Sequence, residues 1–214
     1  MVLDAHLALV HRRLCGVEKG KNVRLYGHTG AANSAFSNAL GAPVATEIDS
    51  TLSVAIFIIN ASQGIDQKTV DLWHEFDEYL MPRILVISGF TEGLQDFDDA
   101  VLIAKRLLED VATPYLVLHE DDGRPCALIS LDDMKIFNYQ TGLITDADQE
   151  HYELLEEFRS EYLSQKEAAG ANGFETGIFF PAIPVLLTGS VDKLLTDLGI
   201  DKVKEYLAQL PSVS

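Results

Sequence analysis

Cysteine and long apolar runs are nearly absent from this chain of 214 residues. Cys15 and Cys126 are too few and too far apart in sequence for a disulfide framework or a zinc site, so we expect two small hydrophobic side chains. No apolar run reaches the roughly 18 residues of a membrane-spanning helix. Residues 1–16 lack the basic start and the small-residue cleavage site of a signal peptide. These absences predict a cytoplasmic protein with no membrane partner.

Basic residues are also scarce. The chain has 16 Lys and Arg residues against 33 Asp and Glu residues, which gives a net charge of −17. Because such a field repels phosphates, we expect no free nucleic acid as a partner. The acidity is typical of solvated helix faces, and a basic protein partner is the alternative interpretation.

Apolar segments are plentiful, since 47% of the residues are hydrophobic, and one sizeable core with a smaller lobe can form. SVAIFIINA, residues 53–61, is continuous, apolar and rich in β-branched side chains, which is typical of a strand with helices on both faces. Similar patterns predict strands at 23–26, 83–87, 115–119 and 183–187, and helices at 4–14, 34–40, 65–79, 98–108, 191–198 and 201–209. The alternation predicts an α/β fold with a parallel sheet.

The composition changes after His119. Residues 126–131 and 135–139 predict two short strands around a turn, and residues 146–169 predict an acidic helix. We therefore expect a small subdomain at residues 119–175, inserted into a core formed by residues 1–118 and 176–214.

Residues 22–36, NVRLYGHTGAANSAF, have the strand, glycine turn and helix of a phosphate-binding loop. Against the pattern G-x-x-x-x-G-K-[ST], Gly27 holds the first glycine position and Ser34 the hydroxyl position. Ala32 replaces the second glycine, and Asn33 replaces the lysine whose ammonium neutralises the phosphates. The segment predicts the fold of such a loop without its chemistry.

The order of segments is similar to that of the N-terminal G domain of bacterial elongation factor G, a translational GTPase. KNVRLYGHTGAANSA, residues 21–35, aligns with the family's first strand and phosphate loop, commonly written RNIGISAHIDAGKTT. Further matches follow in family order: INASQGIDQKTVDLW, MPRILVISGF, DFDDAV, IPVLLTGS and LPSV. Residues 119–175 resemble a shortened form of the family's extra subdomain. The resemblance implies a P-loop NTPase-like, mostly parallel sheet with helices on both faces, a truncated switch region and a small α+β inserted subdomain.

Each nucleotide motif departs from the family pattern. The segment between Ser34 and Ser53 is too short for the family's magnesium-binding threonine loop, two strands and D-x-P-G-H segment. The base-reading N-K-x-D motif falls on residues 88–91, which carry no carboxylate. The resemblance thus implies two vestigial sites. The vestigial phosphate loop consists of Gly27, His28, Thr29, Gly30, Asn33 and Ser34. The vestigial base site consists of Ser88, Thr91 and Gly189.

These losses predict a pseudo-GTPase, which neither hydrolyses nor tightly binds GTP and has no resident cofactor. Its role would be regulation or interaction with an unidentified protein partner, and the family analogy implies ribosome association. The alternative is an enzyme: a GTP hydrolase with residual activity that binds GTP, GDP or an anion weakly through Gly27, Thr29, Gly30 and Ser34, with magnesium. A third hypothesis is a homodimer, paired at a sheet edge that residues 42–51 leave open.

Other polar groups have two interpretations each. Asp49 is either a surviving magnesium-linked aspartate or a loop-capping carboxylate. His74 and Glu78 are spaced to chelate a metal from one helix face, or they belong to a solvated face. Four aspartates fit no calcium loop and are explained by turn chemistry: Asp121, Asp122, Asp132 and Asp133.

Overall fold

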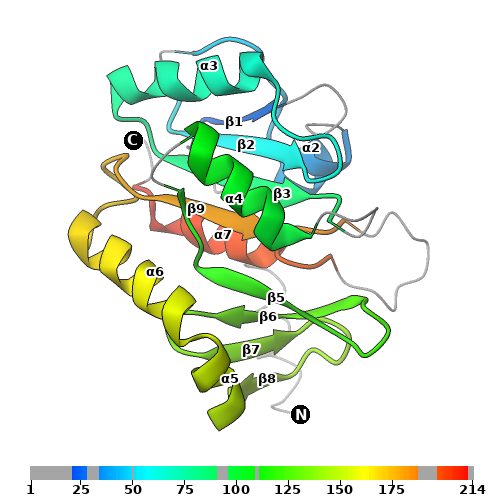
Figure 1. The fold of residues 1–214 in the computed structure, drawn as a ribbon. Helices are drawn as coiled ribbons and strands as arrows, with labels where there is room; N and C mark the ends of the chain where they lie inside the picture. The colour runs from blue at the N-terminus through cyan, green and yellow to red at the C-terminus, as the bar shows by residue number, and fades with distance from the viewer. Residues whose placement is uncertain are drawn as a thin grey trace, which may run out of the picture.

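The computed structural model describes residues 21–27, 34–49, 51–90, 96–108, 111–187 and 197–211, and their strands form two sheets (Figure 1). The larger sheet is parallel, in the order β1 (Val23–Gly27), β2 (Val54–Asn60), β3 (Arg83–Ser88), β9 (Phe180–Pro184) and β4 (Val111–Ala112). The smaller sheet is antiparallel, in the order β5 (Tyr115–His119), β6 (Pro125–Ser130), β7 (Lys135–Asn138) and β8 (Ile144–Asp146). The helical segments are α2 (Ser34–Leu40), α3 (Gln67–Glu75), η1 (Phe76–Tyr79), α4 (Phe97–Leu108), α5 (Gln149–Leu154), α6 (Glu156–Ala169) and α7 (Ile200–Gln209).

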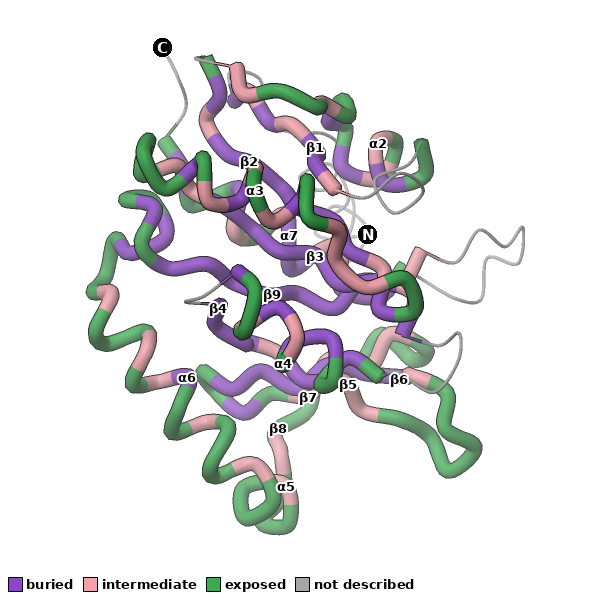
Figure 2. Tube along the Cα trace, turned by 45° about the horizontal axis from the view of Figure 1, so that its top comes forward, coloured by how far each residue is buried: buried purple, intermediate pink, exposed green. Residues whose placement is uncertain are grey.

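Helices cover both faces of the larger sheet. α3 and α4 pack side by side on one face, and α2 and α7 pack side by side on the other (Figure 1). Every residue of β3 and β9 is buried, and so is every residue of β2 except the last. Figure 2 shows these strands as the buried centre of the molecule. The predicted α/β fold, with a mostly parallel sheet and helices on both faces, is confirmed, as is the small antiparallel element.

Phe57 of β2 is at the centre of an aromatic cluster beneath α3. Its ring centroid lies 4.9 Å from that of Trp73, 5.7 Å from that of Phe76 and 5.4 Å from that of Tyr26. All four side chains are fully buried. Edge-to-face and stacked rings at these separations add a specific attraction to the hydrophobic burial, so this cluster fixes α3 on the sheet.

Arg83 is a buried cation at the start of β3. Its guanidinium carbon lies 4.0 Å from the ring centroid of Phe180 and 4.8 Å from that of Trp73. The guanidinium donates to the backbone oxygen of Trp73 and to the carboxylate of Asp77. Burial lowers the pKa of Arg83, and the hydrogen bond to Asp77 opposes that shift. Because a buried charge without partners is costly, these contacts hold α3, β3 and β9 together.

The smaller sheet begins earlier than we predicted. Residues 115–119 form a strand, as expected, but β5 pairs antiparallel with β6 and does not continue the parallel alternation. An apolar run predicts a buried strand without specifying the direction of its neighbour. The division into a core of residues 1–118 and 176–214 and an insertion of residues 119–175 stays a proposal, with β5 at the junction.

The predicted acidic helix at residues 146–169 is three elements. Asp146 ends β8, and the carboxylate of Asp148 then caps α5 by accepting from the backbone N–H of His151 at 3.0 Å. Leu155, with φ −105° and ψ 7°, leaves the helical conformation and separates α5 from α6. Continuous helical periodicity in the sequence concealed this break.

Other boundaries moved by a few residues. The strand predicted at 183–187 is β9, which runs from Phe180 to Pro184. The prediction missed its start because proline is rare in a central strand, and β9 contains Pro181 and Pro184. The helix predicted at 65–79 is α3 followed by η1. The predicted helix at 4–14, and most of that at 191–198, lie outside the described residues. Within the described ranges, no helix has the length and apolar character that a membrane crossing requires.

Candidate functional site

The carboxyl ends of three parallel strands meet at one edge of the larger sheet. β1 ends at Gly27, β2 at Asn60 and β3 at Ser88, and the register pairs Asn60 directly with Ser88. Open α/β sheets bind ligands at the carboxyl ends of their strands. Gly27 of the predicted phosphate loop and Ser88 of the predicted base site both lie at this edge, which is therefore the candidate site.

Gly27 keeps the geometry of a glycine turn. Its φ is 140°, and a Cβ at this position would overlap the backbone oxygen of Ile58 in the neighbouring strand. A side chain is excluded here, as expected for the first glycine of the loop. Ser34 is the exposed first residue of α2. The remaining predicted loop residues lie outside the described ranges: His28, Thr29, Gly30 and Asn33.

Ser88, the described member of the predicted base site, makes an internal contact. The Ser88 hydroxyl donates to the backbone oxygen of Ile59 at 3.0 Å, and Ser88 is 8% exposed. This bond joins β3 to β2 and leaves Ser88 without the exposure that a base-reading side chain needs. Thr91 and Gly189, the other predicted members, lie outside the described residues.

A tight turn follows Ser88. Gly89 has a φ of 69°, and a Cβ there would overlap the side chain of Asn60. Phe90 is buried against Phe97, with ring centroids 6.0 Å apart. Gly89 and Phe90 stand at the second and third positions of the family motif. In residues 88–90, the chain therefore turns into its own core and offers no carboxylate to a base.

Residues 43–45 cover part of the outer edge of β1. The backbone N–H of Leu25 donates to the backbone oxygen of Pro43 at 2.9 Å, and the N–H of Ala45 donates to the oxygen of Leu25 at 2.8 Å. Val44 forms a parallel bridge with Leu25. The edge that we expected to lie open is thus occupied at Leu25, which removes that reason for expecting a homodimer there.

Asp49 caps its own loop. Its carboxylate accepts from the backbone N–H of Thr51 at 2.9 Å and from the Thr51 hydroxyl at 2.8 Å, and it lies 3.5 Å from the Arg24 guanidinium. The backbone hydrogen bond from Thr51 is the main cause that lowers the pKa of Asp49. These bonds support the capping interpretation over a magnesium-linked aspartate.

His74 is held by protein groups at both ring nitrogens. Nδ1 lies 3.3 Å from the Asp77 carboxylate, and Nε2 lies 3.0 Å from the backbone oxygen of Leu107. Among the described residues, no group of three or more His, Cys, Asp and Glu side chains is placed to hold a metal ion. A metal site at His74 and Glu78 therefore has no support in this part of the chain.

The described loops at the strand ends do not fit magnesium and a triphosphate. Residues 60–66, 88–90 and 185–187 contain no Lys or Arg. Their single carboxylate, Asp66, accepts from the backbone N–H of Thr69 at 2.7 Å and caps α3. A magnesium triphosphate needs a cation beside the phosphates and oxygen ligands on the metal. These loops supply no cation, and their carboxylate is engaged in capping α3.

Asn60 is a structural residue of this edge that the sequence did not reveal. Its side-chain oxygen accepts from the backbone N–H of Ser62 at 2.9 Å and from the Ser62 hydroxyl at 2.6 Å. The same side chain packs on Gly89, which is far away in sequence. No local motif announces that contact, because it depends on the register of β2 and β3.

The geometry defines the class first: an α/β domain whose mostly parallel sheet is covered by helices on both faces, with a candidate site at the carboxyl ends of its strands. A crystal structure of a Thermus thermophilus protein matches with a TM-score of 0.56 and 19% identity, over 75% of this chain and 27% of that one. No protein-family model matches the chain.

The particular relatives are elongation factor G-like proteins. Two from Mycobacterium tuberculosis strains are each 28% identical over 166 residues, which covers 65% of this chain and 22% of the relative. The predicted resemblance to elongation factor G is confirmed. The chain spans about a fifth of the length of these relatives.

Proposed function

We propose that this chain is a pseudo-GTPase: an elongation factor G-like domain that neither hydrolyses GTP nor binds it tightly, and that works in the cytoplasm through a protein partner. One observation carries the proposal. α2 ends at Leu40 and β2 begins at Val54, and residues 43–45 between them lie along β1. In the described part of this short connection, residues 41–49 and 51–53, nothing replaces the family's two strands and magnesium-binding loop.

The energetics support the same conclusion. Asn33 replaces the phosphate-binding lysine, and residues 88–91 carry no carboxylate for the base. Losing a charge-assisted bond costs about 1.5 to 3 kcal/mol, so three lost contacts, to phosphate, metal and base, weaken binding by roughly four decades. Hydrolysis suffers more, because it depends on electrostatic stabilisation by the lysine and the magnesium ion.

Isothermal titration with GTP and GDP in magnesium tests the proposal. We expect dissociation constants weaker than about 10 μM and no release of phosphate from GTP. The double variant Ala32→Gly with Asn33→Lys is the matched gain-of-function control, because it restores the glycine and the lysine of the family's phosphate loop. It gains measurable affinity for GTP only if the other contacts to the nucleotide are intact. A dissociation constant below about 10 μM for the unmodified chain would overturn the proposal.

A second candidate function is weak binding of a nucleotide or anion, with residual hydrolysis. Gly27 favours this second candidate, because its positive φ and its close approach to β2 are those expected of the first glycine of a phosphate loop. Titration with inorganic phosphate separates the two. Saturable binding that the Ser34→Ala variant weakens supports this second candidate, whereas its absence supports the first.

The partner we propose is basic. α5 and α6 expose apolar side chains beside carboxylates, and Figure 2 shows these helices as largely exposed. Leu154 is 68% exposed and Phe158 is 47% exposed. A basic surface on a ribosome would complement them, and sedimentation of the chain with bacterial ribosomes, lost at high salt, is the expected result. A chain that stays in the supernatant at low salt contradicts ribosome association.

A further inference from the structure

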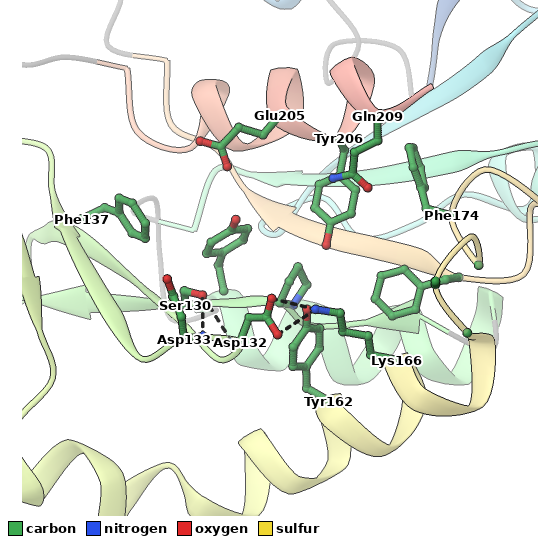
Figure 3. Close-up of a pocket in the computed structure, with 16 residues that line it drawn as sticks. Ser130, Asp132, Asp133, Phe137, Tyr162, Lys166, Phe174, Glu205, Tyr206 and Gln209 are labelled. Atoms are coloured by element: carbon green, nitrogen blue, oxygen red, sulfur yellow. Dashed lines mark hydrogen bonds and ion pairs between the residues drawn. The ribbon is translucent and has the colours of Figure 1, made fainter. Parts of the chain in front are cut away.

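A cavity of about 270 Å³ lies where the smaller sheet meets α6 and α7 (Figure 3). It shares no lining residue with the candidate site at the carboxyl ends of β1, β2 and β3. Six of the sixteen residues that line the cavity carry aromatic rings: Tyr115, Phe137, Tyr162, Phe174, Phe179 and Tyr206. Figure 3 shows Tyr206 projecting from α7 toward Tyr162 and Lys166 on α6. Small-molecule pockets typically measure about 300–1,000 Å³, so this volume suits one small group or a single side chain.

The charged side chains of the cavity are predominantly acidic. Asp132, Asp133 and Glu205 line it, against one lysine, Lys166. Both oxygens of Asp132 lie 2.7 Å from the Lys166 ammonium, so that pair is neutral. Asp133 is only loosely paired, since its carboxylate lies 3.8 Å from the Lys135 ammonium, beyond hydrogen-bonding distance. Glu205 lies 2.9 Å from the Lys202 ammonium, so Asp133 carries the least compensated negative charge, and that charge disfavours an anionic ligand.

The phenols of the cavity stay neutral at physiological pH. Burial is the main cause that raises the pKa of Tyr162 to about 12, and the charge of Asp132 adds to it. Burial, followed by the charge of Glu205, also raises the pKa of Tyr115. Neutral phenol rings present a negative face to a cation.

The chain already binds its own ammonium groups at the wall of this cavity in the same way. Lys202 lies with its nitrogen 3.5 Å from the ring centroid of Phe137 and 2.9 Å from the Glu205 carboxylate. Lys166, besides its pair with Asp132, lies 6.0 Å from the ring centroid of Tyr162. A ring face combined with a carboxylate therefore recurs here as a cation-binding arrangement.

We propose that this cavity is a binding site for an organic cation, an alkylammonium or guanidinium group, held between the rings of Tyr115 and Tyr206 and the carboxylate of Asp133. Its rings, together with the loosely paired Asp133 carboxylate, resemble the aromatic cages that bind quaternary ammonium groups. The group is either a free small cation or a side chain of a basic protein. The site is independent of the candidate site at the strand ends.

Nuclear magnetic resonance of the full chain tests the site. The probes are choline as the free cation, the peptide acetyl-Gly-Arg-Gly-amide as the protein side chain, and 3,3-dimethylbutan-1-ol as the uncharged isostere of choline. At constant ionic strength, we expect a cation to shift resonances of cavity residues with a dissociation constant of about 1 mM or tighter. If the peptide binds more tightly, the bound group is a side chain of a protein partner. If choline binds more tightly, the bound group is a free small cation. The proposal fails if the alcohol binds as well as choline, or if neither cation shifts these resonances at about 50 mM.

Two variants locate the contacts. Asp133→Asn and Tyr206→Leu should each weaken binding of the tighter-binding cation by about fivefold to tenfold. Tyr206→Phe keeps the ring, so its dissociation constant should stay within about twofold of that of the unmodified chain. Asp146→Asn and Tyr152→Leu are matched controls, because both residues are exposed and neither lines the cavity, and they should change nothing. Asp133 is exposed, so its variant tests the proposal even if Tyr206→Leu fails to fold. Unchanged affinity in Asp133→Asn would overturn it.

Discussion

The two sheets of this chain achieve stability in different ways. In the larger sheet, neighbouring strands β2 and β3 are buried almost from end to end, between two layers of helices. In the smaller sheet, burial declines strand by strand, from β6, which is nearly all buried, to β8, which is wholly exposed. A parallel sheet needs cover on both faces, whereas an antiparallel sheet can leave one face in water. The larger sheet is therefore the stable frame, and the smaller one is free to carry surface chemistry.

Aromatic side chains show the same contrast. Around Phe57, rings pack directly on one another, at centroid distances from 4.9 to 5.7 Å. Around Tyr162 and Tyr206, rings also pack in pairs, at centroid distances of 5.2 Å for Phe174 with Tyr206 and 6.3 Å for Tyr162 with Phe179, but they line a cavity of about 270 Å³. Similar residues thus serve packing in one region and, as we propose, binding in the other.

Replacing phenylalanine in each region is the largest test of this contrast. Phe57→Ala should lower the free energy of unfolding by about 3–5 kcal/mol, because it removes a fully buried ring and leaves a cavity. Phe158→Ala, on exposed α6, is the matched control and should change it by no more than about 0.5 kcal/mol. Urea denaturation measures both. Similar losses in the two variants would show that the regions are equally packed.

Two glycines give an intermediate effect. Gly89 and Gly142 have nearly the same φ, 69° and 71°, but an added Cβ overlaps Asn60 at Gly89 and meets nothing within 4 Å at Gly142. Gly142→Ala should cost about 1 kcal/mol from the backbone conformation alone, and Gly89→Ala about 2–3 kcal/mol, because the overlap is added. Thermal unfolding compares them. Equal costs would mean that the Asn60 side chain moves aside freely.

The third effect appears only at alkaline pH. Burial raises the pKa of Tyr26, in the larger core, and of Tyr162, at the cavity, to about 12 from an unfolded value of 10.0. A raised pKa means that the folded state favours the neutral phenol. The contribution is therefore complete below pH 10 and is lost as the pH rises through about 12. Urea titrations at intervals across this range should show a smaller loss for Tyr26→Phe and Tyr162→Phe than for the unmodified chain. Curves that coincide would exclude the phenols as the cause.

Much of the larger sheet was predictable from sequence. The helix at residues 34–40 and the strands at 23–26, 53–61 and 83–87 match the structure to within about a residue, because continuous apolar runs and glycine turns mark them locally. β9 was displaced because its prolines conceal a buried central strand. The direction of β5 and the break at Leu155 depend on tertiary contacts, which no local pattern specifies.

The candidate sites were predictable to different degrees. Gly27 and Ser88 lie at the predicted strand ends, because a parallel sheet brings such positions to one edge. The contact between Asn60 and Gly89 was not predictable, since it depends on strand register. The cavity brings Tyr115, Tyr162 and Tyr206 together from three separate elements. Their spacing in sequence carries no signal of that meeting.

The place of β9 in the larger sheet has a consequence for how the chain folds. β9 pairs with β3 on one side and β4 on the other, yet it is made only after the whole smaller sheet and α6. Pairing that joins distant parts of a chain is slow, because the entropy cost of closing the intervening loop comes before the favourable contacts form. During synthesis, the edge of β3 that pairs with β9 therefore stays unpaired until residues 180–184 emerge from the ribosome. A truncation before residue 180 would leave an aggregation-prone intermediate.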